Sequence, residues 1–104
     1  MRLSPPELEN IRKVVTVFLG STRAELRLYG SRTDDSKKGG DIDLVLIFPD
    51  EQAKNTFKTS PHIITSELKR HLGERKIDFS IITSDHLSDP FWQLSLAGAI
   101  VLLP

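Results

Sequence analysis

The chain has 104 residues, of which 38% are hydrophobic and 27% charged, and this composition predicts one globular domain over residues 1–104. Lys and Arg number 14, as do Asp and Glu, so the zero net charge argues against nucleic acid as the main partner. Cysteine is absent, which excludes a disulfide scaffold, a thiolate zinc site and a cysteine nucleophile. With no signal peptide and no apolar run of membrane-spanning length, we expect a cytoplasmic protein without membrane contact.

The N-terminal part of the chain predicts a helix and then a strand. Ser4 suits the N-cap, Pro5 suits the first helical position, and Glu7, three residues after Ser4, completes a capping box. Gly20 is placed as the C-cap, and the apolar residues between these caps recur at helical spacing (Leu8, Ile11, Val15, Phe18 and Leu19). Residues Glu25 to Tyr29 alternate between apolar and polar, which is typical of a strand.

The middle of the chain holds the clearest strand pattern. Residues 41–48 are almost continuously apolar after the first acidic positions, as in a strand that is buried on both faces. Residues 34–40 are polar and end in glycine, so we predict a loop there. Residues 51–60 contain few apolar side chains and are likewise predicted to form a loop.

The remaining elements are predicted to be helix, strand, helix and strand. Residues 61–73 show a helical apolar face ending at a glycine, and residues 76–83 alternate as a strand does. A cap at Ser84 or Asp85 would start a last helical segment that runs to about residue 96, and residues 99–103 would close the sheet. This order predicts an α/β or α+β fold with a small mixed sheet and helices packed on it.

Three features of this pattern bear chemistry. Gly30 and Ser31 follow the first strand, where a glycine permits close backbone approach to a ligand and a hydroxyl can hold a phosphate. Asp41 and Asp43, here called the acid pair, point to the same face because side chains alternate along a strand. Asp78 interrupts a later apolar strand, where a carboxylate is out of pattern.

The acid pair favours a divalent cation. Two carboxylates about 4 Å apart repel each other by roughly 4 kcal/mol at an effective dielectric constant of about 20, and a bound cation removes this repulsion. Oxygen ligands together with a triphosphate suit Mg²⁺. Asp78 could share the metal or take a proton from an attacking hydroxyl.

These features together resemble a known family. The chain contains, in order, Leu28-Tyr29-Gly30-Ser31-Arg32, Asp41-Ile42-Asp43-Leu44 and Ile77-Asp78-Phe79. This series resembles the nucleotidyltransferase superfamily that includes DNA polymerase beta, and the short chain is similar to the minimal nucleotidyltransferases of MNT–HEPN modules. The resemblance covers nearly the whole chain and implies a polymerase beta-like nucleotidyltransferase palm.

The resemblance also implies roles for individual residues. Gly30, Ser31 and Arg32 match positions beside the triphosphate of a nucleotide. The acid pair matches the carboxylates that hold two Mg²⁺ ions, and Asp78 matches the third carboxylate, which holds the catalytic metal. The implied reaction is attack of a hydroxyl on the α-phosphate of ATP or another nucleoside triphosphate, with release of pyrophosphate.

Three functions remain open at this point. The resemblance implies transfer of AMP to a tyrosine of a small helical HEPN ribonuclease toxin, so that the chain is the antitoxin. A second possibility is a catalytically weak antitoxin that masks its partner by binding alone. A third is the catalytic subunit of a two-chain enzyme that modifies a small molecule. The histidines lack metal-ligand spacing and are expected to be ordinary surface or packing residues (His62, His71 and His86).

Overall fold

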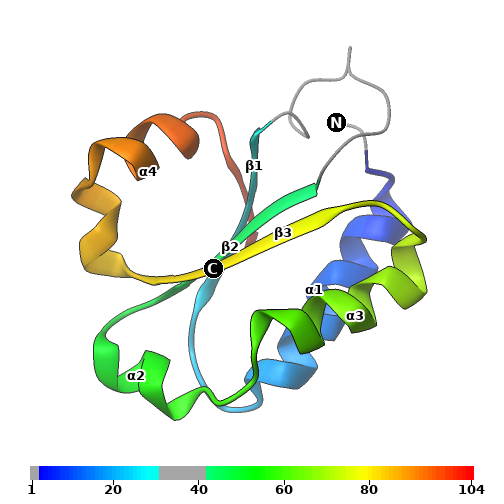
Figure 1. The fold of residues 1–104 in the computed structure, drawn as a ribbon, viewed down its shortest axis with the longest axis horizontal. Coiled ribbons are helices and arrows are strands. Elements are labelled where there is room, and N and C mark those ends of the chain that lie inside the picture. The colour runs from blue at the N-terminus through cyan, green and yellow to red at the C-terminus, as the bar shows by residue number, and fades with distance from the viewer. Residues whose placement is uncertain (1–2, 31–41) are drawn as a thin grey trace.

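Helices cover both faces of a mixed β-sheet in the structure, a computed structural model that describes residues 3–30 and 42–104 (Figure 1). The elements in chain order are α1 (Pro5–Leu19), β1 (Glu25–Tyr29), β2 (Ile42–Phe48), α2 (Glu51–Thr56), α3 (Pro61–Leu72), β3 (Ile77–Thr83), the 3₁₀ helix η2 (Ser84–Ser88), α4 (Pro90–Ser95) and β4 (Ile100–Leu103). Among these residues, no helix is long and apolar enough to cross a membrane.

The strands lie in the order β3-β2-β1-β4. β2 pairs in parallel with β3, whereas β1 runs antiparallel to both β2 and β4. The α+β architecture with a small mixed sheet, predicted from the order of elements, is therefore confirmed.

Helix α1 begins and ends at the predicted caps. The Ser4 hydroxyl accepts from the Glu7 N–H at 3.3 Å, and the Ser4 N–H donates to Glu7 Oε1 at 2.9 Å, so both halves of the capping box are present. Gly20 follows with φ +59°, and its N–H donates to the Thr16 carbonyl. Together these contacts satisfy backbone groups that the helix itself leaves unpaired.

The main core lies between the sheet and the helices α1 and α3 (Figure 1). Alternate residues of β1 and β2 point into it, and they are fully buried (Leu26, Leu28, Ile42, Leu44, Leu46 and Phe48). The helices contribute Ile11, Val15, Ile64 and Leu68. Burial of this apolar area, at about 25 cal/mol per Å², holds the sheet and the two helices together.

A smaller apolar cluster covers the opposite face. Val45, Ile47 and Ile82 are buried there, and side chains of the η2–α4 region pack against them (Leu87, Trp92 and Leu96). Figure 1 shows α4 on the side of the sheet away from α1 and α3. β2 is thus buried on both faces over most of its length, as its apolar run predicts.

Two local predictions are wrong. Residues 51–60 were predicted as a loop, yet they contain α2, which Asp50 caps through a 2.8 Å bond from the Ala53 N–H. This short helix buries none of its residues fully, so it shows no apolar periodicity. The last helical segment is divided into η2 and α4 because a residue before proline avoids the helical region, and Asp89 before Pro90 is extended, with φ −69° and ψ 136°.

The capping box generates a pH-dependent prediction. The hydrogen bond from the Ser4 backbone lowers the pKa of Glu7 from its ordinary value of 4.5, and Arg75 at 2.9 Å adds to this effect. Glu7 therefore stabilises the fold above pH 4.5, and this stabilisation is lost as the pH falls through the lowered pKa. We predict that Glu7→Gln decreases the free energy of unfolding at pH 7 by a few tenths to about 1 kcal/mol.

Urea denaturation at pH 7 and pH 3 measures this effect. The difference between wild type and Glu7→Gln should be smaller at pH 3 than at pH 7, because the stabilisation by ionised Glu7 declines as the pH falls from 4.5 through the lowered pKa. Glu9→Gln is the matched control on the same helix, because Glu9 is half exposed and pairs with Arg12 at 3.5 Å. If Glu7→Gln lost the same free energy of unfolding at both pH values, the stabilisation could not come from the ionised Glu7 carboxylate.

Candidate active site

Two carboxylates lie side by side where β2 and β3 begin. Asp43 is the register partner of Asp78 in the parallel ladder, and neighbouring strands are about 4.8 Å apart. Both residues point to the face that carries Val45 and Ile82. Asp43 is half buried and Asp78 is exposed, so solvent reaches both of these carboxylates.

The apolar residues before each carboxylate explain this placement. Ile42 and Ile77 pair directly and point into the main core, where they are 0% and 8% exposed. The Ile42 N–H donates to the Lys76 carbonyl at 2.9 Å, which aligns the starts of the two strands. The next residue of each strand must then point to the opposite face, and in both strands it is aspartate.

Gly30 lies directly against Asp43. Its φ is +76°, and a Cβ built there would collide with the Asp43 carboxylate and stand 3.2 Å from its Cγ. Only glycine combines this backbone conformation with so close an approach. The sequence suggested that Gly30 admits a ligand, and the structure shows that it also makes room for the Asp43 side chain.

Tyr29 is a neighbour of the acidic residues that sequence reasoning missed. It pairs with Asp43 across the β1–β2 ladder, and its hydroxyl lies near the Ser80 side chain. Burial raises the pKa of Tyr29 above 10.0, and the charges of Asp43 and Asp78 raise it further, against the lowering effect of Ser80. The alternation of β1 predicts which face Tyr29 occupies, but the strand partners are needed to find its neighbours.

The other predicted site residues, Asp41, Ser31 and Arg32, lie outside the described residues. The structure thus brings together Gly30, Asp43 and Asp78, and the roles of all six residues stay predictions. Within residues 3–30 and 42–104 no group of three or more potential metal ligands occurs.

The carboxylates of Asp43 and Asp78 suit Mg²⁺ as a ligand set. Mg²⁺ is usually held by one or two carboxylates, with substrate phosphates and water completing its shell. Two carboxylates that solvent can reach fit this arrangement better than they fit a metal enclosed by protein. The site could therefore hold a magnesium–nucleotide complex, in which the triphosphate supplies the remaining oxygen ligands.

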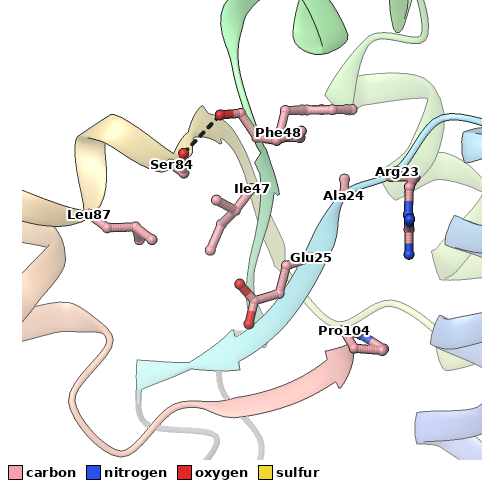
Figure 2. A pocket seen from close by; sticks show the side chains of 9 residues that line it. Arg23, Ala24, Glu25, Ile47, Phe48, Ser84, Leu87 and Pro104 are labelled. Carbon is pink, nitrogen blue, oxygen red and sulfur yellow. Dashed lines mark hydrogen bonds between the residues drawn. The ribbon is translucent and has the colours of Figure 1, made fainter.

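A pocket of about 420 Å³ lies at the other end of the sheet (Figure 2). Its lining includes Arg23, Glu25, Ile47 and Ser84. Glu25 pairs with Ile47, four residues along β1 from the Tyr29–Asp43 pair, which is about 13 Å at strand rise. Glu25 is bound by Arg27 at 3.0 Å, and Ser84 donates to the Pro49 carbonyl, so these two polar side chains of the pocket are engaged in contacts within the protein.

The three histidines are exposed and belong to α3 and η2, not to the strands that carry Asp43 and Asp78. His71 is 3.6 Å from Glu67, and His86 is 3.1 Å from Asp89. These are local contacts between residues three or four positions apart, and such exposed pairs add little to stability.

No family model matches the chain, and no curated protein sequence matches it. Among solved structures, the chain is similar to a "putative nucleotidyltransferase" from Sulfolobus solfataricus. The two share 13% sequence identity with a TM-score of 0.52, over 92% of this chain and 78% of the other. The chain therefore has a nucleotidyltransferase-like fold.

The contact between Gly30 and Asp43 is tested by a matched pair of substitutions. Gly98 has φ +78°, close to that of Gly30, but a Cβ there would meet nothing within 4 Å. Both Gly30→Ala and Gly98→Ala should lose about 1–2 kcal/mol through the left-handed backbone. We predict a larger loss for Gly30→Ala, measured by urea denaturation, because the Asp43 carboxylate must also move. Equal losses would show that this contact is not tight.

The environment of Tyr29 is tested by absorbance at 295 nm, because Tyr29 is the only tyrosine. We predict that its pKa lies above 10 and falls in Asp43→Asn, which removes a charge that opposes ionisation. The fold should accordingly lose stability as the pH rises past 10, where the unfolded chain ionises first. Glu74→Gln, an exposed position, is the control and should leave the pKa unchanged. If the pKa of Tyr29 were unchanged in Asp43→Asn, the Asp43 carboxylate would not lie close to the Tyr29 hydroxyl.

Proposed function

We propose that this chain is a Mg²⁺-dependent nucleotidyltransferase that transfers the nucleoside monophosphate of ATP or another nucleoside triphosphate to a hydroxyl group. The observation that carries the proposal is the register pairing of Asp43 with Asp78, with Gly30 packed against the first of them. The nucleotidyltransferase-like fold supports it independently. In this proposal Asp41, Asp43 and Asp78 hold two Mg²⁺ ions, and Gly30, Ser31 and Arg32 lie beside the triphosphate.

Each carboxylate has a chemical task in this scheme. Bound Mg²⁺ would neutralise charge on the phosphate oxygens. Asp43, half buried beside Gly30, is suited to a fixed ligand position, whereas the exposed Asp78 can be reached by an acceptor. A bond forms between the acceptor oxygen and the α-phosphorus, the bond to pyrophosphate breaks, and the hydroxyl proton passes to Asp78.

The proposed acceptor is a hydroxyl of a partner protein, a small helical HEPN-type toxin, so that the chain acts as an antitoxin. The support is the exposure of Asp78, which leaves its carboxylate open to solvent. A macromolecular hydroxyl could reach such an exposed carboxylate.

Transfer of label from α-labelled ATP tests the proposal. Wild type with Mg²⁺ in a lysate of the source cell should label one protein, and Asp43→Asn and Asp78→Asn should reduce the rate about 100-fold or more, as losses of charge-stabilising groups do. Asp50→Asn is the control, because it removes a charge at the far end of β2 while asparagine still caps α2.

The outcomes separate the remaining alternatives. No label on any protein or small molecule, with ATP intact, would contradict the proposal. If the chain and its Asp43→Asn variant then bound the partner equally well, an antitoxin that acts by masking would be the better account. Label on a small molecule alone would indicate the catalytic subunit of a two-chain enzyme.

A further inference from the structure

A row of three aromatic rings leads from the acidic residues to the surface of α4. The Tyr29 ring meets the Trp92 ring edge-on at 5.7 Å between centroids, and Trp92 meets Phe91 at 4.9 Å with an interplanar angle of 86°. Tyr29 is the register partner of Asp43. The row therefore starts beside the candidate phosphate site and ends at the surface.

The last ring of the row is the exposed one. Tyr29 and Trp92 are partly buried and pack against the Val45 cluster, whereas Phe91 is 64% exposed. Because Phe91 and Trp92 meet nearly at right angles, this contact does not cover both faces of the Phe91 ring. An aromatic ring held in place by a neighbour, with open area left, is suited to stack against a flat ligand.

The aromatic character of the row favours a nucleobase as the flat ligand. Stacking on an aromatic side chain accepts any base, since every base has a π-face. A nucleoside triphosphate carries its base beyond the phosphates, and Phe91 stands two ring contacts, of 5.7 and 4.9 Å between centroids, from Tyr29, the register partner of Asp43.

We propose that Phe91 and Trp92 form the nucleobase platform of this chain, with Phe91 as the ring that stacks on the base. This inference rests on the proposed function, because the phosphates must occupy the acidic end. It predicts modest selectivity among bases, since stacking reads the π-face and not the hydrogen-bonding edge.

The test compares ligands with and without a base. Calorimetry would measure the Kd of a non-hydrolysable ATP analogue and of inorganic tripolyphosphate, each with Mg²⁺. Wild type should bind the analogue at least about fivefold more tightly. Trp92 is the only tryptophan, so its fluorescence should change with the analogue and stay constant with tripolyphosphate.

Substitutions at Phe91 test whether this ring causes the tighter binding of the ATP analogue. Phe91→Ala should bind the analogue no more tightly than tripolyphosphate and should leave the Kd of tripolyphosphate unchanged. Phe91→Tyr should retain the tighter binding of the analogue. Leu94→Ala is the matched control, because Leu94 lies on the same helix and is 81% exposed. It should bind both ligands as wild type does.

Failure of this inference differs from failure of the proposed function. Equal binding of both ligands, or a Phe91→Ala variant that keeps the advantage, would overturn the nucleobase platform alone. A Phe91→Ala variant that lost both ligands equally would also overturn it, since that result indicates a structural role. If wild type bound neither ligand, the proposed function itself would fail.

Discussion

The parallel register between β2 and β3 is the constraint on which the candidate site depends. Ile42 and Ile77 open the two strands opposite each other and are anchored in the main core. A slip of one residue would turn every side chain of β2 to the other face and would bury Asp43 among leucine and isoleucine. Burial of a carboxylate without partners costs several kcal/mol, so the apolar pattern that folds the sheet also fixes Asp43 beside Asp78.

The face of the sheet that carries Asp43 and Asp78 is divided into a buried part and a solvent-exposed part. Toward the end of β2, Val45 and Ile47 are buried under the η2–α4 region, whereas Asp78 at the start of β3 is exposed. Tyr29 stands at the boundary, with its ring against Trp92 and its hydroxyl near the Ser80 side chain. Burial raises the pKa of Tyr29, so near neutral pH it is an uncharged polar group next to two carboxylates.

Much of the fold follows from local patterns in the sequence. The capping box of α1, the alternation of β1 and the apolar run of β2 depend on nearby residues, and all three are confirmed. Helix α2 was missed because its burial is slight. Tyr29 was missed as a neighbour of Asp43, and Trp92 as a neighbour of Tyr29, because these contacts depend on strand pairing and on the placement of α4, which no local pattern specifies. Asp78 could be found because a carboxylate within an apolar strand is out of pattern.

The most direct test of the account is the location of a bound cation. Substoichiometric Mn²⁺ with a non-hydrolysable ATP analogue would broaden backbone amide NMR signals near the metal. The account predicts that broadening centres on Gly30, Asp43 and Asp78, at the starts of β2 and β3, and that Asp43→Asn abolishes it. Broadening centred elsewhere, such as around Glu67 and His71 on α3, or broadening that Asp43→Asn leaves unchanged, would contradict the central claim.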